Sequence, residues 1–309
     1  MAINEAAVNA PVRVPGHARA VILMIGSSVM MSFGGLIIRN MQEADSWQVN
    51  LHRAYAAFLG VLIILLLRYG RTTLRQVRGI GRSGVLGGGL LGMAGVCFLQ
   101  AITTTTVANT LFILSAIPFF SALLARLILG ERLRRVTLFA MSAAACGIVV
   151  MVSAGLSAGA GYGNAMALAT AFLFAAYAVI VRRKRHVDMY PVLLVATVCV
   201  FVVAGSVRFG DWAIPWHDVA LCFLWGGVLS GIANWMFIVA SRNLVAAELT
   251  LFMLLEFSLG PIWVWLFVAE SPSRETIIGG SIVIVAVAVW ALLQMRGRIV
   301  SGRPPADVL

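Results

Sequence analysis

Charged residues are scarce in this sequence. Only 11% of its 309 residues are Asp, Glu, Lys or Arg, whereas 61% are hydrophobic, and the mean hydropathy is +0.96. A soluble domain carries about 25% charged and about 45–50% apolar residues. A chain of this length cannot bury so much apolar surface inside a globule that faces water on all sides. The composition therefore excludes an ordinary soluble protein and predicts an integral membrane protein.

The sequence also lacks the motifs of catalytic, metal and nucleotide sites. Its four cysteines lie in apolar segments without CxxC or metal-ligand spacing, which is typical of small buried hydrophobic residues (Cys97, Cys146, Cys199 and Cys222). The four histidines lie at the ends of apolar runs or between them, and neither HExxH nor GxSxG occurs. No GxxxxGK[ST] motif is present, so ATP-driven pumping by this chain alone is unsupported. We therefore expect no enzyme activity, no cofactor and no metal site.

Acidic residues are half as frequent as basic ones, 12 against 23, which gives a net charge of +11. The basic residues form short clusters between apolar runs, where lipid phosphates and the positive-inside rule explain them. We therefore expect membrane lipid, not nucleic acid, as the partner of these charges, and the sequence indicates no obligate protein partner. The first apolar run is too long for a cleavable signal peptide and lacks a small-x-small cleavage site.

Ten apolar runs, each long enough to cross a bilayer, make up most of the chain. A bilayer core requires about 20 apolar residues per helix. The runs cover residues 19–39, 48–68, 83–103, 106–129, 135–155, 162–182, 189–209, 218–240, 245–268 and 276–295. With a cytoplasmic N-terminus, 19 of the 23 Lys and Arg residues fall in inside segments. This distribution predicts a multi-pass protein with both termini in the cytoplasm.

The two halves of the chain repeat one another. At an offset of 139 residues Gly92, Ala94 and Phe98 fall on Gly231, Ala233 and Phe237, and Glu131 falls on Glu270. The first run resembles the sixth at an offset of 143, "SFGGLIIR" against "AAYAVIVR". Because each half contains five spans, the second copy must enter the membrane inverted. Inverted repeats are typical of secondary transporters, although a duplication also occurs in a channel or a scaffold.

The predicted fold is therefore an all-α membrane protein with ten transmembrane helices in two inverted five-helix repeats. We expect a cytoplasmic tail at residues 1–18, the first repeat at 19–156, the second at 157–296 and a cytoplasmic tail at 297–309. Pro118 and Pro261 interrupt the fourth and ninth runs four positions apart in the repeat register. Membrane helices tolerate proline, and a weakened point allows a bend. We therefore assign both prolines to gating, with a static kink as the alternative.

The fourth and fifth runs of each half resemble the EamA family of the drug/metabolite transporter superfamily. "IPFFSALLARLILGERL" followed by Gly147 matches the family's pattern of a proline, Leu-Gly-Glu and a glycine-containing next helix. "LLEFSLGPIWVWLFVAES" followed by Gly279 keeps the glutamate but has Phe257 in place of a frequent proline and Ala269 in place of glycine. The resemblance covers nearly the whole chain outside the tails. By overall likeness alone, the chain is most similar to the family's aromatic amino-acid exporters.

This resemblance implies a bacterial cytoplasmic (inner) membrane protein that exports amino acids and other small metabolites. It also implies that helices one, three, four, six, eight and nine line a mostly apolar central cavity, with the other four helices outside. We therefore expect a secondary transporter that exports aromatic or hydrophobic amino acids and related metabolites by alternating access. A transporter of another small metabolite, such as a nucleoside, and a channel are the alternatives.

Glu256 is the most informative polar residue, because it lies near the middle of the ninth run. A charge at this depth costs ~2.5–3.5 kcal/mol on insertion scales, and the repeat partner is Ile117, so the fold does not demand an acid. We expect Glu256 to contact a substrate ammonium group or to carry a proton. The alternative is a protonated acid that is hydrogen-bonded to a neighbouring helix. Helices four and nine offer no Lys or Arg at the same depth, so we expect a largely neutral group in the empty protein.

Other candidates come from the same and neighbouring runs. Glu248 and Phe252 share one helix face with Glu256. Glu248 aligns with Asn109, and both lie near the end of their run, which indicates entrance or helix-capping positions for these two residues. Aromatic and amide side chains offer stacking and hydrogen bonds to a flat substrate, with packing or lipid contact as the alternative. Substrate binding is assigned to Glu256, Tyr177, Asn234, Trp235, Phe252, Trp263 and Asn109. The entrance is assigned to Arg53, His52 and Glu248, where Arg53 either binds a substrate carboxylate or snorkels to the interface.

Overall fold

The computed structural model describes residues 17–130, 135–157, 160–183, 189–241, 243–244 and 246–301. The regular structure of these residues is helical throughout. In chain order the elements are α1 (His17–Ser32), α2 (Gly34–Arg39), α3 (Ser46–Tyr69), η2 (Gly70–Thr72), α4 (Thr73–Gly79), α5 (Gly81–Thr104), α6 (Val107–Leu114), α7 (Ile117–Leu129), α8 (Arg135–Ser157), α9 (Gly161–Arg183), α10 (Val192–Val207), α11 (Trp216–Cys222), the π-helical η3 (Phe223–Leu229), α12 (Ser230–Ser241), α13 (Ala246–Val268) and α14 (Arg274–Ser301).

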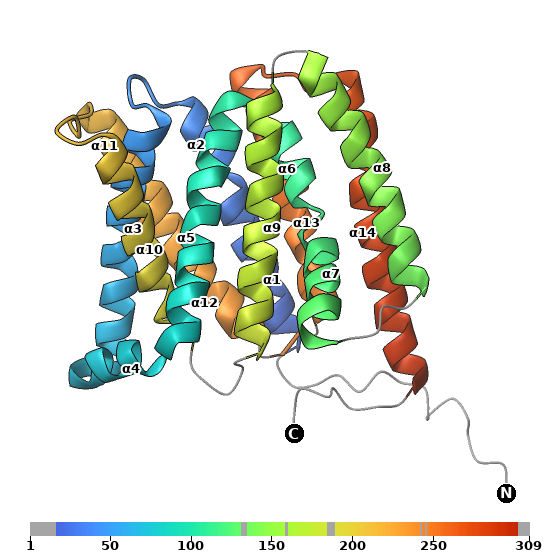
Figure 1. The fold of residues 1–309 in the computed structure, drawn as a ribbon, viewed down its shortest axis with the longest axis horizontal. Coiled ribbons are helices and arrows are strands. Elements are labelled where there is room, and N and C mark those ends of the chain that lie inside the picture. Colours follow the sequence, from blue (N-terminus) through green and yellow to red (C-terminus); the bar gives the residue numbers. More distant parts are fainter. Residues whose placement is uncertain are drawn as a thin grey trace, which may run out of the picture.

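These elements form ten passages, which we number as helices one to ten. Helix one is α1–α2, helix four is α6–α7 and helix eight is α11–η3–α12 (Figure 1). The other helices are single elements: helix two is α3, helix three is α5, helix five is α8, helix six is α9, helix seven is α10, helix nine is α13 and helix ten is α14. Within the described residues, nine passages are long and apolar enough to cross a membrane, and α10 is a shorter apolar helix of 16 residues. The ten apolar runs of the sequence are thus confirmed as helices, and so is the predicted fold class.

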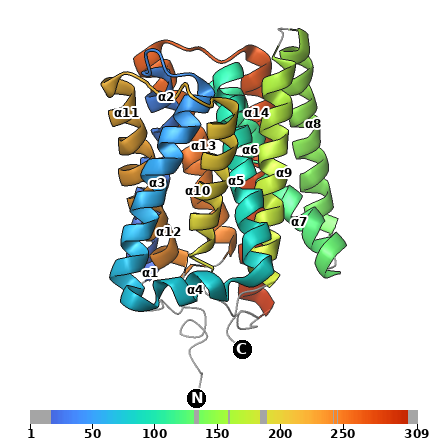
Figure 2. The same ribbon diagram turned by 60° about the vertical axis from the view of Figure 1, so that its left-hand side comes forward.

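The bundle has two ends that the chain visits alternately (Figures 1 and 2). We call the end that carries α4 the α4 end, and the end that carries α11 the α11 end. Helix four begins at Val107 at the α11 end and runs to Gly130 at the α4 end. Glu270, which follows helix nine, accepts a hydrogen bond of 2.8 Å from the backbone N–H of Val107. Glu131 itself lies outside the described residues, but its neighbour Gly130 and its repeat partner Glu270 lie at opposite ends.

The pairing of the helices shows the inverted repeat directly. Helix three packs against helices six and seven, and helix eight packs against helices one and two. Helix one packs against helix nine, and helix four packs against helix six. Each pair becomes its counterpart when every helix is exchanged with the one five places away, as a pseudo-twofold axis requires.

Helices five and ten pack against each other at one edge of the bundle (Figure 1). Their contact is reciprocal: a Cβ added at Gly147 would lie 2.5 Å from the Gly279 carbonyl oxygen, and one added at Gly279 would lie 2.5 Å from the Gly147 carbonyl oxygen. Two glycines therefore bring these backbones together at equivalent points, as small residues do between membrane helices.

The glycine stripes of helices three and eight serve helix packing. A Cβ at Gly88 would lie 2.5 Å from the Val195 side chain, and one at Gly92 would lie 2.7 Å from the Ala196 carbonyl oxygen. Gly226 of helix eight lies as closely against the backbone of Arg53 in helix two. These contacts draw helices seven and two towards the centre of the bundle.

The two prolines have different local effects. Helix four is interrupted between Leu114 and Ile117, and Pro118 is at the start of α7, where its missing N–H removes no helical hydrogen bond. Helix nine instead continues through Pro261 without interruption. Helix one is also interrupted, at Phe33, without a proline.

Candidate functional site

Two cavities with a common wall lie between the repeats. The central cavity has a volume of about 320 Å³ and is lined by helices one, two, three, four, six, eight and nine. The mouth cavity has a volume of about 530 Å³ and extends along helix two towards the α4 end, as far as Arg68. Both volumes are within the range of about 300–1,000 Å³ that is typical of small-molecule sites. The side chains shared by the two cavities are Met31, Arg53, Leu91, Phe174, Asn234 and Phe237.

The central cavity is built from equivalent positions of the two repeats. Helices three and eight contribute Phe98 and Phe237, which are repeat partners at the offset of 139 residues. Helices four and nine contribute Ile117 and Glu256, which are partners at the same offset. The two halves thus enclose the cavity symmetrically, and the acid on one side alone makes it chemically asymmetric.

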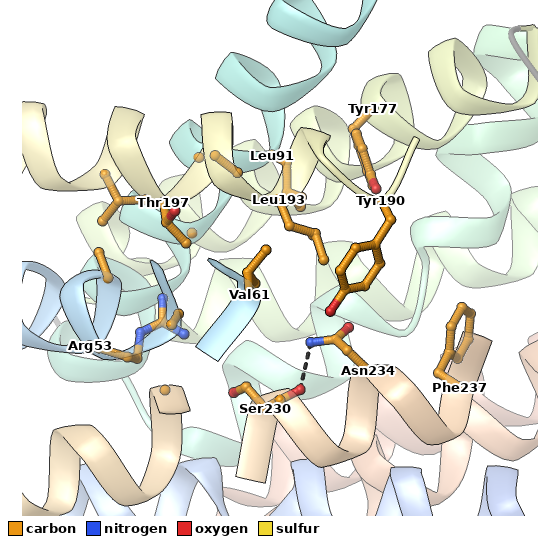
Figure 3. A pocket seen from close by; sticks show the side chains of 18 of the residues that line it. Arg53, Val61, Leu91, Tyr177, Tyr190, Leu193, Thr197, Ser230, Asn234 and Phe237 are labelled. Atoms are coloured by element: carbon orange, nitrogen blue, oxygen red, sulfur yellow. Dashed lines mark hydrogen bonds between the residues drawn. The ribbon is translucent and has the colours of Figure 1, made fainter. Parts of the chain in front are cut away.

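The mouth cavity corrects one expectation about the surrounding helices. We expected helices two and seven to lie outside the cavity, yet Val61 of helix two and Leu193 and Thr197 of helix seven line its wall (Figure 3). The reason is the close approach at the glycine stripes, which brings these two helices inward. None of the described side chains of helices five and ten lines the mouth or the central cavity, as expected.

Glu256 is half-buried in the wall of the central cavity. The wall that it shares with helices four and nine includes the apolar side chains of Leu114, Ile117 and Phe257. Within the described part of the chain its carboxyl group forms neither a hydrogen bond nor an ion pair. The acid is therefore available to a ligand.

Arg53 lies deeper than its position near the start of helix two suggested. Its side chain lines both the mouth and the central cavity, so it is not an entrance residue at the membrane surface (Figure 3). The guanidinium carbon lies 4.7 Å from the centroid of the Trp225 ring, a cation–π contact. The Nε atom is buried without a hydrogen-bond partner among the described residues. A cation is thus present in the cavity, although helices four and nine supply none.

Tyr177 and Asn234 lie in the mouth cavity, as the sequence analysis proposed for substrate-binding residues. The Asn234 amide donates a 2.7 Å hydrogen bond to the Ser230 carbonyl oxygen within helix eight. Tyr190 points towards Asn234 across the cavity (Figure 3), and the Tyr177 ring lies edge-on to Phe174 at 5.8 Å. Tyr177, Tyr190 and Asn234 therefore supply polar groups to the wall of the mouth cavity.

Four of the proposed substrate-binding residues do not line the mouth or the central cavity. Trp235 is on the surface with 49% of its area exposed, and Phe252 packs in a cluster around Met24 and Ala240. Trp263 stacks on Phe33 with ring centroids 5.3 Å apart and donates a 2.9 Å hydrogen bond to the Ser32 hydroxyl. Asn109 hydrogen-bonds the buried Asn164 near the α11 end.

Of the two remaining entrance candidates, His52 is among the described residues and lines neither the mouth nor the central cavity. The His52 ring is hydrogen-bonded to the Gln48 carbonyl oxygen at 2.9 Å, one turn earlier in helix two. Glu248 belongs to the first turn of α13, and its side chain lies outside the described residues. Two contributors that the sequence analysis missed are Trp225 and Phe237. Phe237 was recognisable as the repeat partner of Phe98, whereas Trp225 lies in a π-helical segment that no sequence signal revealed.

A group of hydrogen-bonded residues links the helices at the α11 end of the bundle. We call it the Arg39–Glu270 clamp (Arg39, Thr105, Val107 and Glu270). Arg39 Nε donates to Glu270 Oε2 at 2.6 Å, and Arg39 Nη2 donates to the Thr105 carbonyl oxygen at 2.9 Å. The other Glu270 oxygen accepts from the Val107 N–H. The clamp thus joins the ends of helices one and nine to the start of helix four.

The packing beneath the clamp is close. A Cβ at Gly35 would lie 2.6 Å from the Val107 side chain. Towards the α4 end, the described residues of α7 show no comparable packing against α13. A third cavity of about 380 Å³ lies there instead, lined by Pro118 and Ser121 of α7 and Leu249 of α13. The structure is therefore closed at the α11 end and more open towards the α4 end.

Two inverted five-helix repeats around an enclosed cavity are the architecture of secondary transporters. The model of the EamA-like transporter family matches residues 18–153, so the chain is similar to that family over most of the first repeat. The matched family is one of transporters.

Two other comparisons extend beyond the first repeat. The pseudopaline exporter CntI of Pseudomonas aeruginosa, found in strains UCBPP-PA14 and PAO1, is 27% identical over 202 residues, which cover 62% of this chain and 68% of that protein. A solved crystal structure superposes with a TM-score of 0.66 over 91% of this chain and 99% of its own, at 19% identity, and shows the fold alone.

Proposed function

We propose that this protein exports amino acids with aromatic or hydrophobic side chains, and related small metabolites, across the bacterial inner membrane by alternating access. The observation that carries the proposal is the largely apolar cavity between the two repeats, whose described lining contains one acid, Glu256, without an ion-pair partner among the described residues. Apolar walls suit the substrate side chain, and the acid suits its ammonium group. The similarity to an exporter of another small metabolite supports the direction of transport.

Glu256 binds the ammonium group by Coulomb attraction in this proposal. The interaction is strong because the surrounding wall is apolar and screens charge poorly. The repeat partner Ile117 offers no such interaction, so the substrate binds in one orientation relative to the two repeats.

Access alternates between the two ends in this proposal. The present conformation takes substrate from the α4 end, which the positive-inside rule places in the cytoplasm. Release at the α11 end requires the Arg39–Glu270 clamp to open and α7 to close on α13. The interruption of helix four before Pro118 is one point at which this movement can occur.

Proteoliposomes with a panel of radiolabelled amino acids test the function, with and without a pH gradient. We expect saturable transport of phenylalanine, tryptophan or leucine. Glu256→Gln keeps the shape of the side chain and removes its charge, so transport should fall about tenfold or more, which corresponds to a loss of about 1.4 kcal/mol in binding. Glu275→Gln, at an exposed site on α14, is the matched control and should transport normally.

Three results would contradict the proposal. Normal transport by the Glu256→Gln protein between pH 5 and 8 would reduce Glu256 to a packing residue. A wild-type protein that transports no amino acid of the panel, but does transport another metabolite such as a nucleoside, would favour the alternative substrate class. Unitary conductance in planar bilayers would identify a channel.

A further inference from the structure

We infer that Arg53 forms a carboxylate-binding subsite where the mouth and central cavities meet, so that the substrate must carry both a carboxylate and an ammonium group. This inference rests on the proposed function, because it concerns the same cavity. It adds a second charged contact and thereby narrows the substrate class to zwitterions of the amino-acid type.

The first support is the position of the Arg53 side chain. It leaves helix two in the second turn of α3 and lines both cavities (Figure 3). Gly95 of helix three lies opposite: a Cβ built there would be 3.6 Å from Arg53 Nη2, so a larger side chain would occupy the space beside the guanidinium group. The position is therefore unlike that of an arginine that snorkels to the membrane surface.

The second support is the unsatisfied hydrogen-bonding capacity of this side chain. Arginine remains charged in proteins and presents five N–H donors around a planar group. The face of the guanidinium group is covered by Trp225 at 4.7 Å, but Nε is buried without a partner among the described residues. Stacking on an aromatic ring stabilises the charge without satisfying the N–H groups at its edge. A carboxylate satisfies two of these donors at once in a bidentate geometry.

The third support is the relation between Arg53 and Glu256. Both residues line the central cavity, from helix two and helix nine, yet they form no ion pair with each other. Two unpaired opposite charges in one largely apolar cavity match a ligand that carries the complementary pair. The carboxylate of the substrate binds Arg53, its ammonium group binds Glu256, and its side chain contacts the apolar wall, which includes Phe98 and Phe237.

The experiment is an equilibrium binding assay on the full-length protein in detergent, which requires no transport. Radiolabelled phenylalanine is the probe, and the competitors are phenethylamine, which lacks the carboxylate, and 3-phenylpropionate, which lacks the amine. We expect the wild type to prefer phenylalanine to either competitor by at least tenfold. In Arg53→Gln the preference over phenethylamine should vanish, because phenylalanine loses affinity and the amine does not.

Arg53→Lys and Arg71→Gln complete the series. Lysine keeps the charge but loses the planar pair of donors. The preference of the Arg53→Lys protein for phenylalanine over phenethylamine should therefore lie between that of the wild type and that of Arg53→Gln. Arg71 is exposed at the α4 end, and its replacement should leave all three affinities unchanged. Thermal unfolding of each variant shows whether the fold is retained.

The possible failures are distinguishable. If Arg53→Gln keeps the wild-type preference over phenethylamine, or loses affinity for phenylalanine and the amine by the same factor, the subsite is wrong and the proposed function stands. If Arg53→Gln does not fold, an Arg53→Lys protein with unchanged selectivity overturns the subsite equally. If the wild type binds none of the three compounds, the proposed function fails together with the subsite.

Discussion

At the scale of single residues, one pair of equivalent positions in the two repeats shows how alanine in place of glycine strains the backbone at a helix end. Gly130 and Ala269 are partners at the offset of 139 residues, and both end a helix in the left-handed region, with φ of 70° and 58°. Glycine adopts this conformation without strain, and it commonly ends helices in this way. Alanine is strained there because its Cβ approaches the following carbonyl oxygen. The family pattern of glycine at this position, from which Ala269 departs, therefore has a conformational cause.

Ala269→Gly should stabilise the protein. Relief of the left-handed strain at this residue is worth about 1–2 kcal/mol, less the entropy that glycine adds to the unfolded chain. We therefore expect an increase of about 1 kcal/mol in the free energy of unfolding, measured by denaturation in detergent. Ala145→Gly, at an exposed helical site in α8, is the control and should destabilise by about 0.5–1 kcal/mol. An equal loss of stability in both variants would refute the explanation.

At the scale of helices, the clamp at the α11 end is the clearest device for holding one conformation. It combines a charge-assisted bond between Arg39 and Glu270 with a bond from Glu270 to the first N–H of α6. Hydrogen bonds to charged groups contribute about 1.5–3 kcal/mol each. Because helices one, four and nine all line the central cavity, we expect a change at the clamp to alter the shape of that cavity.

Glu270→Gln should favour the conformation that is open at the α11 end. A loss of about 1.4 kcal/mol from the closed state shifts the equilibrium tenfold. The measurement is the labelling rate of Val107→Cys, whose side chain is fully buried beneath the clamp and lines neither cavity, with a hydrophilic maleimide in a background without native cysteines. We expect about tenfold faster labelling than in the parent, and no change in Glu275→Gln. Identical rates in the clamp variant and its parent would show that the clamp does not hold the α11 end closed.

At the scale of the whole molecule, the sequence predicted the architecture better than the site. Hydropathy and the repeat register located ten helices and paired Phe98 with Phe237 and Ile117 with Glu256, and all four residues line the central cavity. Hydropathy does not give the rotation of a helix about its axis, so Trp235 was chosen although it faces outward.

The interior position of Arg53 was likewise beyond the sequence. It depends on the close approach of helix two to Gly226, and its partner Trp225 belongs to the π-helical segment Phe223–Leu229. Neither the contact between two helices distant in the chain nor the π-helical hydrogen-bond pattern has a signature in local composition. The position of each helix along the chain is thus predictable from the sequence, whereas the direction in which an individual side chain points depends on the assembled bundle.

The inversion of the repeats yields the last prediction, because equivalent loops must emerge on opposite sides of the membrane. The connection between helices two and three contains α4 and lies at the α4 end, whereas the connection between helices seven and eight lies at the α11 end (Figure 1). The first connection carries Arg71, Arg75 and Arg78, whereas the second carries one cation, Arg208, together with Asp211. The positive-inside rule therefore predicts that the first connection lies in the cytoplasm and the second outside. Cysteines at Gly79 and Asp211, both exposed positions, report these locations. In spheroplasts a membrane-impermeant maleimide should label Asp211→Cys at once and Gly79→Cys only after lysis. Labelling of both cysteines from the outside would contradict the inverted arrangement, and the reverse pattern would reverse the orientation and with it the proposed direction of substrate entry.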